Sequence, residues 1–231
     1  MVIKGLQKTT LLDFPGKLAC TVFTAGCNFR CPFCHNASLV LRAGEVAEIP
    51  MNELYSYLDK RSGLLDGVCI TGGEPLLNPD IDELIVKIRS YGLLVKLDTN
   101  GAYPDRLENL LDRGLVDYVA MDVKNADEKY GLTVGLGDSY SLGDINRSID
   151  IIINKAPDYE FRTTVVRELH DKSDLENIAK KLANAKKYFI QKYVDSGDIL
   201  ASGYSAYEDS EMLQMLEAVR AVLPVAALRG V

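Results

Sequence analysis

Apolar residues recur along this chain in two alternating patterns. Short runs rich in β-branched and aromatic residues predict buried strands over residues 18–24, 67–71, 93–97, 116–121, 159–166 and 187–194. Apolar residues at helical spacing predict helices near residues 50–63, 80–91, 104–113, 141–155, 173–185 and 208–223. Strands that alternate with helices form right-handed β–α–β units and a parallel sheet. The pattern predicts an α/β fold, a partial (β/α)6 TIM-like barrel of parallel strands that is laterally open.

Two helix starts carry local signals as well. Ser173-Asp-Leu-Glu176 predicts a capping box, and Asn78-Pro79-Asp80 predicts a helix entry with early acidic residues. The chain contains no internal repeat, low-complexity tract or obvious linker. We therefore expect a single domain over residues 1–231, with a core at about 11–195 and a C-terminal helical extension at about 205–231.

Polar side chains gather where the predicted strands end. Active sites of barrels with parallel strands are built at the carboxyl ends of the strands, so these groups are expected to share one face. In strand order the groups are the loop Cys27–Cys34, Thr71–Pro75, Asp98–Gly101, Asp122 with Lys124, Arg162–Arg167, and Gln191 with Tyr193.

Composition narrows the range of partners and compartments. The 231 residues are 47% hydrophobic and 26% charged, as in an ordinary globular protein, and the net charge is −7. This balance argues against a general binder of nucleic acid or of anionic membranes. The N-terminal residues lack the pattern of a signal peptide, and no apolar stretch is long enough to span a membrane. The five cysteines are not spread like a disulfide framework, so we expect a cytoplasmic location.

Three of those cysteines form the most informative motif, Cys27-x-x-x-Cys31-x-x-Cys34. Thiolates this close can converge on a soft metal centre. An iron–sulfur cube takes four ligands, usually all cysteine, and this motif offers three. A site that is one protein ligand short keeps a position for another molecule, as catalytic zinc sites do.

Other interpretations of the cysteines remain open from the residues alone. The string Cys31-Pro-Phe-Cys34-His35 has the C-x-x-C-H form of a haem attachment site, although no export signal accompanies it. Cys27, Cys31, Cys34 and His35 are also candidates for a structural zinc site, although adjacent Cys34 and His35 would bind one ion with strain. A thioredoxin-type dithiol would leave Cys27 unexplained.

The remaining polar motifs each have a plain structural interpretation beside the functional one. Gly72-Gly73-Glu74-Pro75 is either a tight turn or a loop that approaches a ligand, with Glu74 accepting bonds from an ammonium group. Asp98–Gly101 is either an Asx-type turn or a ligand loop. Asp122 and Lys124 are two residues apart and share one side of a strand, so Lys124 could pair with a ligand carboxylate. His170 is expected at the surface.

The motifs together resemble the radical S-adenosylmethionine superfamily. The cysteine spacing, Phe33 before the last cysteine and the Gly-Gly-Glu sequence carry this resemblance over about residues 11–195. Further motifs resemble activases of glycyl-radical enzymes, most closely the activating proteins of anaerobic ribonucleoside-triphosphate reductase. They are Leu12-Asp-Phe-Pro-Gly16, Cys34-His-Asn36, Gly72-Gly-Glu-Pro-Leu-Leu77, Leu97-Asp-Thr-Asn-Gly101 and Met121-Asp-Val-Lys124.

The resemblance implies a specific set of cofactor contacts. Cys27, Cys31 and Cys34 would hold a [4Fe–4S] cluster whose fourth iron is chelated by S-adenosylmethionine. The remaining residues would contact S-adenosylmethionine: Gly72, Gly73 and Glu74 at the methionine end, Asp122 and Lys124 at the ribose and carboxylate, Thr99 and Asn100 in support, and the backbone near Phe33 and His35 at the adenine. In related activases a histidine of the sixth strand contacts the cofactor, and here Tyr193 occupies that position.

The implied reaction is reductive cleavage of S-adenosylmethionine. An external donor, flavodoxin or ferredoxin, would reduce the cluster, and the resulting 5′-deoxyadenosyl radical would abstract hydrogen from a backbone glycine of the partner enzyme. The expected partner is anaerobic ribonucleotide reductase. Three alternatives remain: an activase of pyruvate formate-lyase or of another glycyl-radical enzyme, a radical enzyme that acts on a small molecule, and a zinc-binding interaction module.

Overall fold

A computed structural model describes all 231 residues and contains one sheet of eight strands. The strands follow one another in chain order across the sheet, and the first and last are not paired with each other. Their bounds are β1 (Ile3–Thr10), β2 (Ala19–Thr24), β3 (Gly67–Gly72), β4 (Leu94–Thr99), β5 (Tyr118–Asp122), β6 (Tyr159–Val165), β7 (Tyr188–Lys192) and β8 (Ala226–Arg229). The sheet is thus an open, curved α/β sheet rather than a closed barrel.

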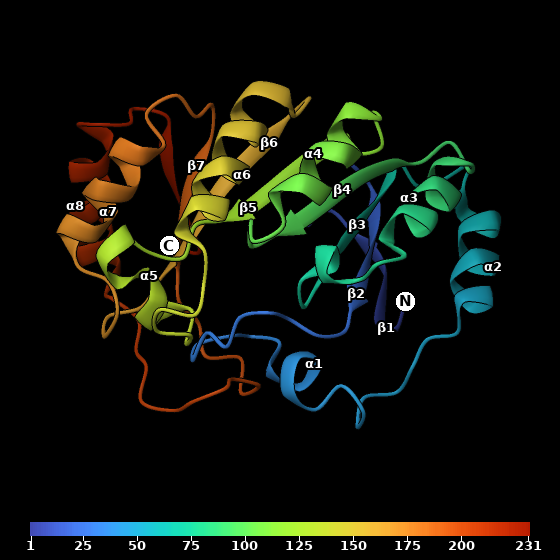
Figure 1. Cartoon of the computed structure of the whole chain (residues 1–231), viewed down its shortest axis with the longest axis horizontal. Coiled ribbons are helices and arrows are strands. Elements are labelled where there is room, and N and C mark those ends of the chain that lie inside the picture. Colours follow the sequence, from blue (N-terminus) through green and yellow to red (C-terminus); the bar gives the residue numbers. More distant parts are fainter.

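The longer helices cover the outer side of this curved sheet, whereas residues 25–50, which contain one short helix, run across the opposite side (Figure 1). Such helical cover is expected because parallel strands are joined by crossover helices. The helices are α1 (Ala37–Leu41), α2 (Met51–Arg61), α3 (Ile81–Arg89), α4 (Pro104–Asp112), α5 (Asp127–Thr133), α6 (Leu142–Lys155), α7 (Lys172–Lys181) and α8 (Asp209–Arg220), with a short 3₁₀ turn at Pro75–Leu77.

The apolar periodicity explains how these elements pack. In α3 the buried residues Ile81, Leu84, Ile85 and Ile88 lie on one face, because they are three or four residues apart. In β2 every residue except Phe23 is buried, as expected for a strand covered on both faces. One continuous cluster of 52 buried residues runs from Ile3 to Ala226. No helix combines the length and the apolarity that crossing a bilayer requires.

The prediction of an open barrel of parallel strands is confirmed, and so are the six predicted strands and the six predicted helices. Two strands were not predicted. The first, β1, pairs antiparallel with β2 and has exposed or half-buried residues along most of its length. The second, β8, is four residues long and pairs parallel with β7.

The predicted capping box of α7 is wrong. Asp171 caps this helix: its carboxylate accepts from the backbone N–H groups of Ser173 and Asp174, and Asp174 accepts in return from the Asp171 N–H. The box therefore lies two residues earlier than the Ser173–Glu176 signal indicated. Asp171 is the N-cap residue and Asp174 is the N3 residue.

Candidate functional site

The cysteine loop joins β2 to α1 and is fixed by backbone hydrogen bonds to distant segments. The Gly26 N–H donates to the Leu39 carbonyl at 3.0 Å, and the Arg30 N–H donates to the Val134 carbonyl at 2.8 Å. Gly26 has a φ of 79°, which glycine adopts without strain. All five cysteines of the chain are free thiols. The loop thus presents Cys27, Cys31 and Cys34 to the carboxyl ends of the strands.

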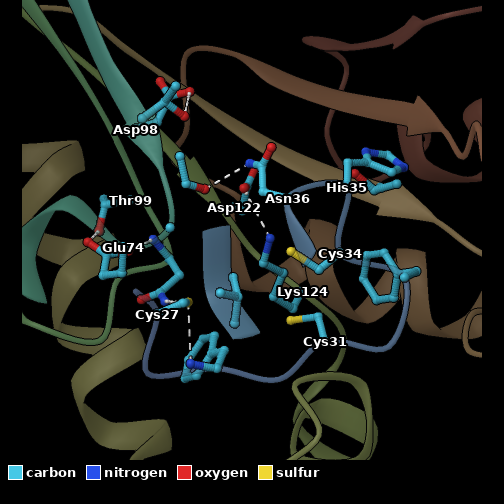
Figure 2. Close-up of a pocket in the computed structure, with 18 of the residues that line it drawn as sticks. Cys27, Cys31, Cys34, His35, Asn36, Glu74, Asp98, Thr99, Asp122 and Lys124 are labelled. Carbon is cyan, nitrogen blue, oxygen red and sulfur yellow. Dashed lines mark hydrogen bonds and ion pairs between the residues drawn. The ribbon is translucent and has the colours of Figure 1, made fainter. Parts of the chain in front are cut away.

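The three thiols line one open cavity at the carboxyl ends of the strands. Every strand from β3 to β6 contributes residues to its wall, as expected for the active face of a barrel. The other lining residues are Phe29, Phe33, His35, Asn36, Val40, Thr71, Gly72, Gly73, Glu74, Asp98, Thr99, Asn100, Asp122, Lys124, Arg162 and Thr164. All the predicted site residues except Tyr193 are therefore brought together (Figure 2).

The loop after β3 packs backbone to backbone against the cysteine loop. The Glu74 N–H donates to the Gly26 carbonyl at 2.8 Å. A Cβ atom on Gly73 would lie 1.8 Å from the same carbonyl oxygen, so no larger residue fits there. Gly72 has a φ of 110°, which also favours glycine. The two glycines are thus required for the close approach of the two loops.

The Glu74 carboxylate connects the ends of β3 and β4. It is almost fully buried and accepts hydrogen bonds from the Leu76 N–H at 3.0 Å, the Thr99 hydroxyl at 2.9 Å and the Asn100 N–H at 2.7 Å. Burial raises its pKa to about 7, against the effect of these bonds. Without any bound ligand, Glu74 therefore already links the ends of the two strands through these three hydrogen bonds.

Asn100 links the end of β4 to the cysteine loop. Its side-chain amide donates to Asn28 Oδ1 at 2.8 Å and lies 3.7 Å from Cys27 Sγ. Cys27 Sγ also accepts from the Phe29 N–H at 3.3 Å. Two N–H donors next to a sulfur stabilise its thiolate form, as the sulfurs of iron–sulfur sites require.

Asp122 and Lys124 form the charged wall of the cavity. Lys124 Nζ donates to Asp122 Oδ2 at 3.0 Å, and Figure 2 shows the amine next to the sulfurs of Cys31 and Cys34. Burial disfavours the charge of Lys124, but Asp122 outweighs it and raises the lysine pKa. Burial likewise opposes ionisation of Asp122, but Arg162 and Lys124 outweigh it and lower the Asp122 pKa. Both groups are charged at neutral pH.

The thiols themselves are protonated in the metal-free protein. Burial raises the pKa of Cys27 to about 11 and that of Cys31 to about 12, while Lys124 acts in the opposite direction. Metal ligation requires thiolates, so binding would release protons from these groups.

The donor set fits an iron–sulfur cube that is accompanied by a small ligand. In a cube each cysteine binds a different iron, so the cysteine sulfurs do not converge on a common point. Three soft thiols on one side and charged oxygen and nitrogen groups on the other fit a cluster together with a small charged molecule.

Two residues lie elsewhere than the sequence indicated. Tyr193 does not line the cavity; its buried ring stacks on His35, with centroids 5.5 Å apart. His170 is 2% exposed, so its predicted surface position is wrong. Its Nε2 atom lies 2.8 Å from the Lys124 carbonyl, and its Nδ1 lies 3.2 Å from the Val166 nitrogen. A neutral His170 therefore fixes the backbone that carries Lys124.

Seven lining residues were missing from the candidate set: Phe29, Asn36, Val40, Thr71, Asp98, Arg162 and Thr164. Asn36, Asp98 and Arg162 are the three of these with amide or charged side chains. Asn36 donates from its side chain to the Gly72 carbonyl at 2.8 Å, and Asp98 and Arg162 form ion pairs inside the barrel. Asn36 and Asp98 lie within motifs that the sequence analysis singled out, and Arg162 lies in the predicted fifth strand. Their position beside Gly72 and Asp122 depends on strand register, which the sequence pattern does not supply.

An open parallel α/β sheet with a three-thiol cavity at its carboxyl edge defines the class of the protein. The model of the radical SAM superfamily matches residues 21–194, and the chain belongs to this superfamily. Its members use a [4Fe–4S] cluster and S-adenosylmethionine, and these are the cofactors of this protein.

The chain is similar to curated proteins that are named as activating enzymes. A putative glycyl-radical enzyme activating enzyme, MJ1227 of Methanocaldococcus jannaschii, is 32% identical over 195 residues, covering 83% of this chain and 80% of the relative. The pyruvate formate-lyase-activating enzyme of Clostridium pasteurianum is 29% identical over 204 residues, covering 83% and 81%.

Solved structures share the fold. Streptococcus suis SuiB bound to S-adenosylmethionine superimposes with a TM-score of 0.68 at 15% identity, covering 90% of this chain and 49% of SuiB. TYW1 with a lysine-pyruvate adduct superimposes with a TM-score of 0.59 at 17% identity, covering 89% of this chain and 74% of TYW1.

Proposed function

We propose that this protein is an activase that generates a glycyl radical on anaerobic ribonucleoside-triphosphate reductase. The observation that carries the proposal is the cavity in which Cys27, Cys31 and Cys34 face the loop of Glu74 and the pair Asp122–Lys124. The similarity to curated activating enzymes supports the reaction class. The motifs around Leu12–Gly16 and Met121–Lys124 support the choice of reductase as partner.

In this proposal Cys27, Cys31 and Cys34 hold three irons of the cluster, and S-adenosylmethionine takes the fourth. Together the bound cofactors supply one-electron reductive cleavage of a sulfonium carbon–sulfur bond. The electron comes from flavodoxin or ferredoxin. Five free cysteines fit the reducing cytoplasm that such a donor requires.

The residues of the chain bind and orient the methionine end. Lys124 has three donors and spends one on Asp122, so two remain for the carboxylate of S-adenosylmethionine. Glu74 has about four lone-pair sites and fills three of them, which leaves one for the ammonium group. A cation at that position would favour ionised Glu74 and bring its pKa back down.

The nucleoside end faces Asp122 and the cysteine loop. Asp122 accepts one bond from Arg162 and one from Lys124, and its remaining lone pairs are available to ribose hydroxyls. The backbone at Phe33 and His35 borders the cavity on the side where the adenine would lie. Tyr193 acts indirectly, because its ring stacks on His35.

An open barrel suits a macromolecular substrate. Because β1 and β8 are unpaired with each other, the cavity is not enclosed by a complete ring of strands. A glycine-bearing loop of a partner enzyme can enter from the open side, and its docking excludes water from the site. A closed pocket would instead suit a small molecule.

The proposal is tested by electron paramagnetic resonance with candidate partners. The reconstituted, reduced protein is mixed with S-adenosylmethionine and, separately, with the anaerobic ribonucleotide reductase and each other glycyl-radical enzyme of the source genome. We expect a glycyl-radical signal on the reductase, and none when its radical-site glycine is replaced by alanine.

The other outcomes identify the alternatives. A signal only on a pyruvate formate-lyase would establish that alternative, which the relative from Clostridium pasteurianum favours. Cleavage of S-adenosylmethionine without any protein radical would indicate a small-molecule enzyme.

A further inference from the structure

A series of alternating charges begins inside the barrel and reaches the wall of the cavity. It consists of Lys96 and Asp98 on β4, Arg162 on β6, Asp122 at the end of β5, and Lys124 just beyond it. Lys96 Nζ contacts Asp98 Oδ1, and Lys124 Nζ contacts Asp122 Oδ2 at 3.0 Å. We call these five residues the charge series.

Arg162 is the centre of the charge series. Its Nε donates to Asp122 Oδ1 at 2.9 Å, and its Nη1 and Nη2 each lie 3.3 Å from Asp98 Oδ2. The strand register places Arg162 directly opposite Asp122. Its side chain is 14% exposed, and that of Asp98 is 15% exposed, so solvent screens these contacts only weakly. Arg162 is the one cation that contacts both aspartates.

No other cation can substitute for this bridge. Lys96 reaches Asp98 alone, and Lys124 reaches Asp122 alone. A lysine has no planar fork and could not bond both carboxylates in the same geometry. Without the bridging guanidinium, Asp98 and Asp122, whose side chains are 15% and 30% exposed, would be two neighbouring carboxylates without a shared cation, which favours protonation of one of them.

The bridge determines what Asp122 offers to the cavity. Arg162 occupies Oδ1 and Lys124 occupies Oδ2, so the carboxylate is held by two fixed contacts from β6 and from the chain beyond β5. Two contacts fix its plane, and the remaining lone pairs point away from those donors. An orientation held before ligand binding lowers the entropy that the ligand must overcome.

We propose that Arg162 is a positioning residue for nucleoside recognition: it keeps Asp122 ionised and oriented so that Asp122 accepts ribose hydroxyls. This inference rests on the proposed role of Asp122 toward S-adenosylmethionine. It assigns no direct ligand contact to Arg162, which acts through Asp122.

Other charged groups around Asp122 define the background for a test. From β6, Glu160 lies 3.8 Å from Arg162 and is itself paired with Arg229 of β8 at 3.0 Å. From the cysteine loop, the thiols of Cys31 and Cys34 share the cavity with Asp122. These residues are retained in an Arg162 variant, so a ratio of variant to wild-type affinity reports the loss of Arg162 from its contacts with Asp98, Asp122 and, at 3.8 Å, Glu160.

The test measures ligand binding by calorimetry on anaerobically reconstituted protein. The probes are S-adenosylmethionine and 5′-methylthioadenosine, which has the nucleoside but no amino-acid group for Glu74 to bind. The variants are Arg162→Met and Arg162→Lys. Arg167→Met is the control, since it removes an arginine whose Nη1 donates to Glu211 at 3.0 Å outside the cavity.

Arg162→Met should weaken binding of both probes by about 10–100-fold, the usual effect of losing a hydrogen bond to a charged group. Its affinity for 5′-methylthioadenosine, divided by that of the wild type, should fall further as the pH is lowered from about 8 to 5.5. Without Arg162, a proton shared by Asp98 and Asp122 would then occupy an oxygen of Asp122 that otherwise accepts a ribose hydroxyl. Arg162→Lys should weaken binding less and restore a ratio that does not vary with pH. Arg167→Met should bind as the wild type does.

Each outcome decides a different claim. Wild-type affinity of Arg162→Met at every pH would overturn the positioning role while leaving the proposed function intact. Absence of S-adenosylmethionine binding in the wild type would instead overturn the proposed function. If Arg162→Met does not fold, as judged by circular dichroism, wild-type affinity of Arg162→Lys would overturn the inference, and weakened binding with a constant pH ratio would support it.

Discussion

At the scale of single residues, Glu74 shows how one carboxylate serves both the fold and the site. Its three hydrogen bonds join the loop after β3 to the end of β4, and it borders the cavity as well. Burial raises its pKa to about 7, so near neutral pH ionisation of Glu74 costs free energy in the protein without its cofactors. A bound ammonium group would offset that cost.

This cost predicts a pH dependence of stability. The pKa of Glu74 is higher in the folded protein than the usual value of about 4.3, so its contribution is complete below that value and is lost as the pH rises through about 7. We expect the free energy of unfolding of the cluster-free wild type, relative to Glu74→Gln, to fall by about 1–3 kcal/mol over this window. Urea unfolding at several pH values measures it, and a constant difference would contradict the assignment.

A site residue could be predicted from the sequence only where its position depends on neighbours along the chain rather than on tertiary structure. Cys27, Cys31 and Cys34 are close along the chain, so their spacing alone indicated a shared site. Arg162 and His170 reach the site only through the register of β6 and the turn after it. The position of His170 in a charged segment suggested exposure, because the folding of that segment back onto Lys124 is a tertiary effect.

At the scale of elements, the contact between the cysteine loop and the loop after β3 is the tightest in the site. Gly73 leaves no space for a side chain against the Gly26 carbonyl. A second contact holds the far end of the cysteine loop, where Asp198 accepts from the backbone N–H and the hydroxyl of Ser38 at 3.1 and 2.6 Å at the start of α1. The loop that carries the thiols is thus held at both ends.

Gly73→Ala should separate these loops. A methyl group 1.8 Å from a backbone oxygen requires the backbone to move, so we expect iron content after reconstitution to fall at least about fivefold. Gly63→Ala is the matched control, because nothing lies within 4 Å of its Cβ position and its φ is not left-handed. Iron and sulfide analysis measures the effect; equal cluster content in the two variants would contradict this account of the loop contact.

At the scale of the whole molecule, the C-terminal segment belongs to the same core as the barrel. Met212 and Val219 of α8, together with Leu223 and Ala226, are nearly inaccessible to solvent. Arg229 of β8 donates two hydrogen bonds of 3.0 Å to Glu160. We therefore propose that residues 1–231 form one domain, in which residues 205–231 cover the edge of β7 rather than forming a separate unit.

This architecture predicts a single unfolding transition and no stable truncated form. Each buried apolar side chain of α8 contributes roughly 1.5–3 kcal/mol, so several of them approach the total stability of about 5–15 kcal/mol that a domain has. We expect calorimetry of the full chain to give one transition, and the fragment 1–207 to lack native circular dichroism. A fragment that melts as the full chain does would show that the extension is dispensable.

The sequence predicted the central architecture but not its two edges. Strands β2 to β7 are apolar runs between helices, and this pattern defines them without tertiary information. In β1 the residues from Lys4 to Thr9 are half-buried or exposed, and β8 is too short to show a period, so neither had a recognisable pattern. Both are strands because a neighbouring strand offers them an edge to pair with.

The central claim is that the three-thiol cavity performs cluster-dependent cleavage of S-adenosylmethionine. The most direct measurement is anaerobic reconstitution with iron and sulfide, followed by reduction in the presence of S-adenosylmethionine and quantification of 5′-deoxyadenosine and methionine. We predict that the wild type forms both products and that Cys31→Ala forms neither. A colourless protein that binds zinc and forms no 5′-deoxyadenosine would contradict the account.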